Sequence, residues 1–388
     1  MIRHVEPPNS RFRDHMDPKV ADWIKPYNDG GSADGTDGSA VDSGRGDGTG
    51  EGSVGNSGRG DGTGESSVGN SDAGIRGGRS ADDGRPDSEV MQVDSFDAAI
   101  LGVPLSKTSI SHSAAFRLPD AIRSIFHSFS PYNMNHRLDL SEVLQVVDIG
   151  NVQMHLTDLQ LCHQWVEDAV KSYWQSHSAP VIVLGGDHSI TGAAMLGLTQ
   201  ATERTYGVIH FDAHHDVRNL EDGGRSNGTP FRTLLSSGAV SGKHVVQIGL
   251  RDYVNARAYH EYVLQNGVTV VTAREVHHRG LMSVLEEAYR IASDGTDAVY
   301  LSFDMDVLDQ SHVPGVPAPG PGGLAIYDVI EALEWLGAKP NIEMMDIVCA
   351  DPSQDFRDLT TRVAANVVLS FLTGLAMRKQ MSAADMMG

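Results

Sequence analysis

Three short clusters of carboxylates and histidines contain the residues of this chain that are best suited to bind metal ions. The candidate ligands in these clusters are His188, Asp212, His214, Asp216, Asp304 and Asp306. Four carboxylates and two imidazoles that converge would form a cage for two divalent cations. A pair of such cations generates hydroxide near neutral pH and stabilises a tetrahedral transition state. The sequence therefore predicts a binuclear hydrolytic site.

Each cluster follows a run of apolar residues that predicts a buried strand. The three runs are 181–184, 206–211 and 298–303. Alternate residues of a strand share a face, so Asp212, His214 and Asp216 should project together if the chain stays extended. The same argument applies to Asp304 and Asp306. A single Asp-x-Asp at a strand end is more often a turn or a helix cap. Three clusters, each after an apolar run, favour the metal site.

Short β-rich runs alternate with helical patterns from residue 97 onward. The further predicted strands are 98–103, 245–249, 268–271 and 342–348, and the predicted helices are 156–176, 281–292 and 327–336. Strands rich in Val and Ile that alternate with helices predict an α/β fold, with a mostly parallel sheet covered on both faces. Open sheets of this kind place their sites beyond the carboxyl ends of the strands. The six candidate ligands lie at these ends.

The composition divides the chain into three parts. Residues 28–92 consist almost entirely of Gly, Ser, Asp, Thr and Arg, and they include a tandem repeat, 43–56 and 57–70. Such a segment buries too little apolar surface to offset its chain entropy, which predicts a disordered linker. It would join an amino-terminal segment, 1–27, to a catalytic domain, 93–388. In the first segment, a short amphipathic helix is expected to dock through Trp23 and Ile24.

The charge and the cysteine content restrict the partners and the compartment. A net charge of -21 argues against nucleic acid, whose phosphates require a basic surface. We find no signal-peptide pattern and no run that approaches the length of a membrane span, so no membrane association is expected. Two cysteines, Cys162 and Cys349, do not make a disulfide framework, and a reducing cytoplasm suits them.

The three clusters, in this order, resemble the signature of the ureohydrolase (arginase-agmatinase) family over residues 97–378. The resemblance implies a three-layer αβα sandwich, two Mn²⁺ ions and hydrolysis of amidine or guanidine C–N bonds. It implies that one ion is bound by His188, Asp212, Asp216 and Asp304, and the other by Asp212, His214, Asp304 and Asp306. Asp212 and Asp304 would bridge the two ions. Hard carboxylates with a minority of imidazole also suit Mn²⁺ better than Zn²⁺ or copper. A homo-oligomer is expected, since family members are commonly trimers or hexamers.

Four stretches are similar to the branch of this family that cleaves N-formimidoyl-glutamate in histidine breakdown. These stretches are 102–113, 216–224, 227–232 and 304–312. Asn227 stands where arginases carry a proton-shuttling His, and it is a candidate substrate contact. Cys349 stands where most guanidine hydrolases carry a Glu that accepts from the guanidinium. A thiol is a poor acceptor, which argues against arginine and agmatine as substrates. Cys349 is expected either to pack in the core or to contact the substrate.

The implied reaction assigns roles to further residues. Hydroxide would attack the formimidoyl carbon, and Asp306 or Asp216 would pass a proton to the departing nitrogen, giving glutamate and formamide. This small-molecule substrate carries two carboxylates, for which Arg232 and Arg251 are the candidate partners. A salt bridge to a nearby Asp is the alternative for each Arg. His215 is expected to point away from His214. We interpret three further histidines as surface or core residues: His260, His277 and His278.

Three rival functions are compatible with parts of this pattern. The same centre could hydrolyse agmatine or another guanidino acid, against which Cys349 argues. A zinc deacetylase of similar architecture would not need His188 or Asp306. A metal-binding regulatory relative without activity would be favoured by the loss of a bridging ligand, and none is missing.

Overall fold

The computed structural model describes residues 16–27 and 95–385, and their side chains as far as Ser382. All of these residues belong to one compact unit. The predicted linker, residues 28–92, lies outside the described residues.

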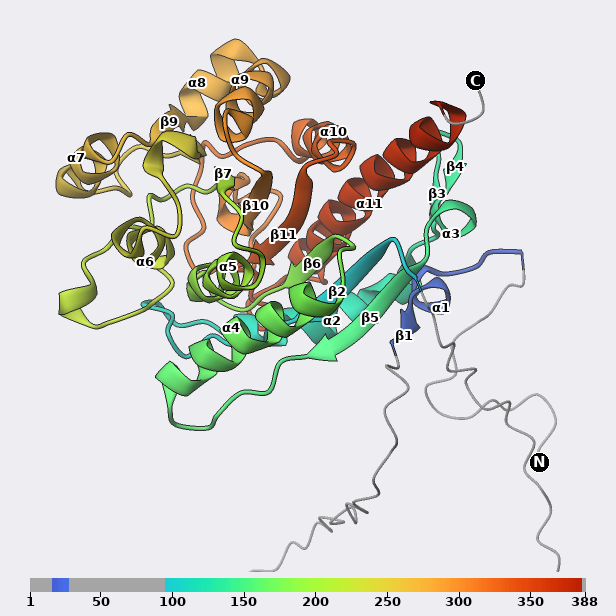
Figure 1. Cartoon of the computed structure of the whole chain (residues 1–388), viewed down its shortest axis with the longest axis horizontal. Coiled ribbons are helices and arrows are strands. Elements are labelled where there is room, and N and C mark those ends of the chain that lie inside the picture. Colours follow the sequence, from blue (N-terminus) through green and yellow to red (C-terminus); the bar gives the residue numbers. More distant parts are fainter. Residues whose placement is uncertain (1–15, 28–94, 386–388) are drawn as a thin grey trace, which may run out of the picture. The chain divides into compact units, whose positions relative to one another are not determined.

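A nine-stranded sheet runs through this unit, and all neighbouring strands in it are parallel (Figure 1). In sheet order, the strands are β1 (Lys25–Pro26), β5 (Val146–Asn151), β2 (Ala98–Gly102), β6 (Val181–Leu184), β11 (Ile342–Val348), β10 (Ala298–Asp304), β7 (Tyr206–Phe211), β8 (Val245–Leu250) and β9 (Thr269–Thr272). A separate antiparallel pair joins β3 (Tyr132–Asn133) to β4 (Leu138–Asp139). The seven predicted strands are confirmed to within one residue at each end. β1 and β5 were not predicted.

Helices cover both faces of the sheet. On one face the core includes α1 (Val20–Trp23), α2 (Leu118–Ile125), α3 (Leu140–Val143), α8 (Ala273–Arg279), α9 (Leu281–Ser293), α10 (Ile326–Gly337) and α11 (Leu359–Asp385). On the other face it includes α4 (Leu159–Ser176), α5 (Ser189–Thr202), α6 (Pro230–Ser237) and α7 (Arg257–Gln265). Strand side chains alternate between these cores: Ile100 enters the first core, and its neighbours Ala99 and Leu101 enter the second. The three-layer αβα sandwich predicted from the sequence is confirmed.

The amino-terminal segment is part of this sandwich. Val20, in the single turn of α1, is fully buried, while Trp23 and Ile24 pack against the core. The Trp23 indole N–H donates to the carbonyl of Leu144 at 3.0 Å. Directly after this turn, β1 pairs with β5 at the edge of the sheet.

The expectation that no run reaches the length of a membrane span was wrong. By length and composition, residues 359–382 of α11 could cross a membrane. However, 78% of the most apolar stretch of this helix is buried inside the described unit. Its apolar side chains, including Val367, Val368 and Phe371, belong to the core beside the sheet. The helix is therefore apolar because it packs in the protein interior.

Four adjacent strands, β6, β11, β10 and β7, form the middle of the sheet and lead into the candidate clusters. The chain leaves β6 through Gly185 and Gly186. A Cβ atom on Gly186 would lie 1.7 Å from the carbonyl oxygen of Leu105, so another residue would collide with that backbone. Glycine is therefore needed here for the close packing of two chain segments. Parallel strands end on the same side of the sheet, which brings the clusters together.

Candidate metal centre

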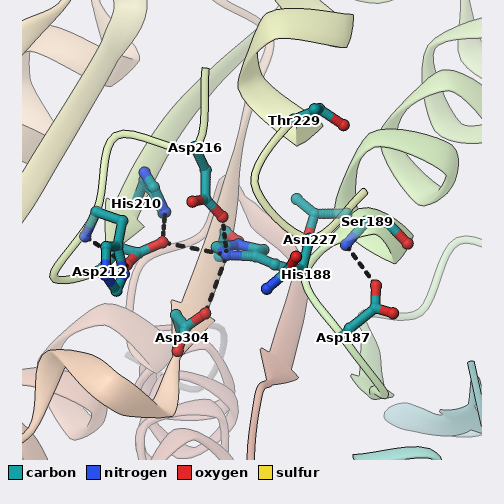
Figure 2. Close-up of polar contacts among 12 residues, drawn as sticks. Asp187, His188, Ser189, His210, Asp212, Asp216, Asn227, Thr229 and Asp304 are labelled. Carbon is teal, nitrogen blue, oxygen red and sulfur yellow. Dashed lines mark hydrogen bonds and ion pairs between the residues drawn. The ribbon is translucent and has the colours of Figure 1, made fainter. Parts of the chain in front are cut away.

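His188 lies at the centre of a group of three carboxylates (Figure 2). It follows β6 and immediately precedes α5. Its Nδ1 atom lies 3.1 Å from Asp212 Oδ2, 2.9 Å from Asp216 Oδ2 and 3.1 Å from Asp304 Oδ2. Potential ligand atoms of all four residues lie within 4.8 Å of one another. The structure therefore brings together the four residues expected to hold the first ion.

The other ring nitrogen of His188 fixes its tautomer. His188 Nε2 lies 3.0 Å from Ser302 Oγ, and the Ser302 hydroxyl donates to Asp346 Oδ1 at 3.0 Å. Because Ser302 donates to Asp346, its oxygen accepts from His188 Nε2–H. Nδ1 is then the ring nitrogen that faces the three carboxylates. Burial lowers the pKa of His188, but these carboxylates outweigh it and raise the pKa well above its usual value, so a proton or a bound cation must compensate their charge. Nδ1 is a buried polar atom without a hydrogen-bond partner, as expected of an atom that ligates a cation.

A second group adjoins the first and shares Asp212 with it. His214 Nδ1 lies 3.3 Å from Asp212 Oδ1 and 3.1 Å from Asp306 Oδ2. Asp212 thus presents Oδ2 to one group and Oδ1 to the other, which suits a bridging ligand. Asp304 belongs to the first group, and its Oδ1 accepts from the Asp306 backbone N–H at 2.8 Å. The bridging role of Asp304 stays a prediction.

The route by which these side chains converge differs from the expected one. β7 ends at Phe211, residues 212–219 form neither helix nor strand, and Asp216 has a left-handed backbone with φ of 51°. Asp306 lies in a short 3-10 helix, Met305–Val307, whose first turn is capped by the Asp304 side chain. The condition of a continuously extended chain is therefore not met. Turns after the strands, and not the two-residue repeat of a strand, aim the ligands at one another.

The electrostatics of the group call for a cation. Burial and the neighbouring carboxylate of Asp212 raise the pKa of Asp216 to about 6. Burial, together with Asp306 and Asp212, raises the pKa of Asp304 to about 8. Burial lowers the pKa of His214, but Asp306 and Asp212 outweigh it and raise the value to about 12. Buried carboxylates this close must be neutralised by protons or by metal ions. Oxygen donors with two imidazoles fit hard divalent cations such as Mn²⁺.

Cys349 also reaches this group, because β11 lies between β6 and β10 in the sheet. It follows β11, has a left-handed backbone with φ of 63°, and is almost fully buried. Its Sγ atom, a His188 nitrogen and an Asp304 oxygen lie within 4.8 Å of one another. Burial, followed by Asp304 and Asp306, holds the pKa of the Cys349 thiol well above its usual range. Cys349 is therefore a neutral thiol that both packs in the core and faces the candidate centre.

A pocket of about 690 Å³ opens beside His214. Arg251, Tyr253, Arg274 and His277 line it, together with residues 318–323. The Arg251 guanidinium donates to the carbonyls of Ala318 and Gly320, and Arg274 pairs with Asp252 at 2.8 Å. Arg274 was not singled out from the sequence. His277, which we interpreted as a surface or core residue, is exposed and lines this pocket.

Two other expected substrate contacts, Arg232 and Asn227, do not line this pocket. The Arg232 guanidinium stacks 3.4 Å from the centre of the Tyr262 ring, and its Nε donates to the carbonyl of Val217. Arg232 does not line the pocket beside His214. Asn227 binds the 108–110 loop. Its side-chain Oδ1 accepts from the Ile110 backbone N–H at 2.9 Å, and its backbone N–H donates to the Thr108 carbonyl. Substrate contact by Asn227 stays a prediction.

The structure also reveals buried polar residues around the ligands that the sequence did not single out. His210 Nε2 lies 2.9 Å from Asp212 Oδ2 (Figure 2), and burial lowers the pKa of His210 to about 4. On the opposite side of His188, the Thr108 hydroxyl donates to the buried Asp187 carboxylate at 2.7 Å. Alternating polar residues inside β7 and β10, such as His210 and Ser302, were the available signal for this second layer.

Comparison with known proteins agrees with this geometry. The model of the arginase family matches residues 96–374. The chain belongs to the arginase family. This confirms the expected ureohydrolase relationship and argues against a zinc deacetylase.

Several arginase-family relatives are named formimidoylglutamase. The one from Halalkalibacterium halodurans is 45% identical over 284 residues, which are 73% of this chain and 88% of the relative. The one from Bacillus subtilis is 42% identical over 279 residues, 71% of this chain and 86% of the relative. The solved structure of formimidoylglutamase from Bacillus subtilis superposes with a TM-score of 0.77 at 32% identity, covering 96% of this chain and 97% of that one. A Trypanosoma cruzi formiminoglutamase with Mn²⁺ has a TM-score of 0.68 at 28% identity, covering 73% and 94%.

Proposed function

We propose that this chain is a binuclear manganese hydrolase that converts N-formimidoyl-L-glutamate and water into L-glutamate and formamide. The observation that carries the proposal is the position of His188 Nδ1, buried among three carboxylates, next to a second group that shares Asp212. Family membership and the formimidoylglutamase relatives at 42–45% identity support the same reaction.

Each of the two groups of side chains is proposed to hold one ion, and the groups share Asp212. His188, Asp212, Asp216 and Asp304 would hold the first Mn²⁺, and Asp212, His214 and Asp306 the second, with Asp304 as a further bridge. When bound, the ions supply hydroxide near neutral pH and compensate the charge of a tetrahedral transition state. The oxygen-rich donor set explains the choice of manganese over softer metals.

Two carboxylates of the cage are proposed to move the proton. Asp306 lies beside His214 at the end of the cage that adjoins the pocket, and Asp216 lies at the other end. Either carboxylate can accept the proton released by the attacking water and deliver it to the departing glutamate nitrogen. Asn227, at the position where arginases have a His, cannot shuttle a proton itself. It holds the 108–110 loop instead.

The pocket beside His214 is proposed to hold the glutamate part of the substrate. Arg274 and His277 are the side chains that can pair with its carboxylates. Arg251 uses its terminal nitrogens to fix residues 318 and 320, so we assign it to shaping the pocket wall. The neutral thiol of Cys349 provides no ionised acceptor for a guanidinium, and the formimidoyl group has one nitrogen fewer to bind.

A formamide-release assay in the presence of Mn²⁺ tests this assignment. N-formimidoyl-glutamate should be turned over, while arginine and agmatine should release no urea. Asp304→Ala serves as the control, because it removes a proposed ligand and should abolish both Mn²⁺ occupancy and turnover. Urea release from a guanidine, without formamide release from N-formimidoyl-glutamate, would overturn the proposal.

A guanidino acid such as guanidinobutyrate is the second candidate substrate. A guanidinobutyrase from Pseudomonas aeruginosa is 31% identical over 288 residues. The cationic pocket favours an acidic guanidino compound over agmatine, which is a cation. The same assay, read out as urea, separates this substrate from N-formimidoyl-glutamate. A homo-oligomer and a cytoplasmic location stay predictions, and light scattering of the purified protein checks the former.

A further inference from the structure

A chain of hydrogen bonds connects the shared ligand Asp212 to the protein surface. Asp212 Oδ2 lies 2.9 Å from His210 Nε2, and His210 Nδ1 lies 3.1 Å from Gln247 Nε2. Gln247 Oε1 lies 2.6 Å from His215 Nδ1, and His215 Nε2 lies 3.2 Å from His260 Nδ1. The first four residues are buried, and His260 is exposed on α7. The chain therefore runs from the centre of the cage to solvent.

The partners of Gln247 determine its amide orientation. Its Nε2 also lies 2.9 Å from the carbonyl oxygen of His215, which can only accept. Nε2 is therefore the amide nitrogen and donates to both the His215 carbonyl and His210 Nδ1. The other amide atom, Oε1, must accept, so His215 Nδ1 carries a proton.

The remaining directions follow from these assignments. A neutral His210 that accepts at Nδ1 carries its proton on Nε2 and donates to the Asp212 carboxylate. A neutral His215 that donates at Nδ1 accepts at Nε2, so His260 Nδ1–H donates to it. Every hydrogen bond in the chain thus points from the surface toward Asp212. Each hydrogen bond pairs one donor with one acceptor, so no two N–H groups of neighbouring residues point at each other.

Packing holds the members of this chain in place. His210 on β7 and Gln247 on β8 are direct partners in the strand register. The His210 ring stacks on Phe231 of α6, with centroids 3.9 Å apart and planes at 28°. These contacts fix the plane of the imidazole and aim Nε2 at Asp212 Oδ2.

We propose that His210, Gln247, His215 and His260 form a positioning network that orients Asp212 as the shared ligand of both metal ions. The network holds Oδ2 on the His188 side, and Oδ1 remains available to the His214 side. A hydrogen bond from His210 to one carboxylate oxygen prevents rotation of the group about its last bond. The inference rests on the proposed manganese site, and it adds residues that touch neither the ions nor the substrate.

Matched variants of His210 test the proposal through metal binding. Phe keeps the ring that stacks on Phe231 but has no donor, while the side-chain amide of Gln places a donor near the position of Nε2. Titration of metal-free protein with Mn²⁺, followed by the paramagnetic resonance signal of free Mn²⁺, gives the affinity. We expect His210→Phe to bind roughly 10- to 100-fold more weakly, the usual loss when such a partner of a ligand is removed. His210→Gln should keep most of the affinity. A packing role predicts the reverse order, and that result would overturn the proposal.

The tautomers give a second readout that needs neither metal nor substrate. Nitrogen-15 spectra of the metal-free wild-type protein should show His210 protonated at Nε2 and His215 protonated at Nδ1. Gln247→Leu, which removes both amide partners, should abolish this preference at His210. A wild-type His210 protonated at Nδ1 would refute the network even if a variant fails to fold.

The two proposals fail in distinguishable ways. Wild-type protein that binds no Mn²⁺ would contradict the proposed function. Wild-type protein that binds Mn²⁺ with the same affinity as His210→Phe would contradict this inference alone. Replacement of the exposed His260 by Phe provides a fold-preserving control, and its loss of affinity should be smaller than that of His210→Phe. If His260→Phe lost as much Mn²⁺ affinity as His210→Phe, or more, the result would contradict an effect that reaches Asp212 through the buried residues of the network.

Discussion

The cage and the pocket beside it are built on opposite principles. The six proposed ligands of the cage lie at or after the ends of the central strands β6, β7 and β10; four of them are buried, and His214 and Asp216 are partly buried. The pocket wall comes from segments after β8 and β9 and from residues 318–323, and it carries the exposed residues Tyr253 and Arg274. The proposed ion-binding part is therefore fixed by the sheet, whereas the proposed substrate pocket is built from surface segments that can vary independently.

The largest expected effect concerns the cage. Asp304→Ala removes an oxygen that lies 3.1 Å from His188 Nδ1 and should reduce turnover by at least about 100-fold, beyond the usual effect of a residue that only supports a ligand. Metal analysis after dialysis and the formamide assay measure the two losses. Asp328→Ala, at an exposed position of α10 and outside the cage, is the control. An active variant without bound metal would refute the cage mechanism.

The next effect concerns the pocket. Arg274→Ala removes a charged hydrogen-bond donor to a substrate carboxylate, which should raise KM about tenfold and leave kcat nearly unchanged. Steady-state kinetics with N-formimidoyl-glutamate measures both constants. Arg257→Ala, which removes an exposed pair with Glu261 on α7, is the matched control and should change neither constant. A loss confined to kcat would place Arg274 in the chemical step and break the division between cage and pocket.

A moderate effect distinguishes the metal-free cage from the loaded one. Folding raises the pKa of Asp304 to about 8 and that of His214 to about 12, from ordinary values of 3.8 and 6.5. Between pH 6.5 and 8, the folded metal-free protein therefore binds more protons than the unfolded chain, and its stability falls as the pH rises. Mn²⁺ competes with these protons, so the stability of the loaded protein should rise over the same window. Thermal unfolding with a chelator, and separately with Mn²⁺, measures both slopes. Parallel slopes would contradict metal binding at these groups.

The smallest effect is expected far from both regions. Tyr27 and Phe96, on either side of the predicted linker, are in contact, with ring centroids 5.6 Å apart, and the Tyr27 hydroxyl hydrogen-bonds with His177 at 3.1 Å. A short Gly-Ser loop could replace residues 30–90 without separating these ends. Turnover and unfolding temperature should stay close to wild type. A large loss of turnover would show that the linker contributes to the site.

The sequence predicted that the three clusters converge, because the signals for this are local. Each cluster combines ligand residue types with an adjacent apolar strand, so residue identity and strand position together indicate the site. The pocket depends on strand order: β8 and β9 must follow β7 in the sheet before Arg274 and His277 come near His214. That order is not visible in composition or periodicity. Arg232 was misplaced for the same reason, since its position on α6 directs it to Tyr262 of α7.

The helices show a similar limit. The prediction found α4, α9 and α10, whose apolar residues recur on one side. It missed α5, where small residues are buried on nearly all sides and leave no polar face to mark the period.

The two-residue strand β1 has a consequence for how the protein behaves in concentrated solution. It pairs with the outer edge of β5, whose backbone amide and carbonyl groups could otherwise form hydrogen bonds with a strand from another molecule. The edge that β1 itself exposes is only two residues long, and it is poor in hydrogen-bond donors because Pro26 lacks an N–H. Removal of residues 16–27 would therefore expose β5 as an unprotected edge strand. Self-association of the protein would rise, although every proposed ligand of the cage is retained.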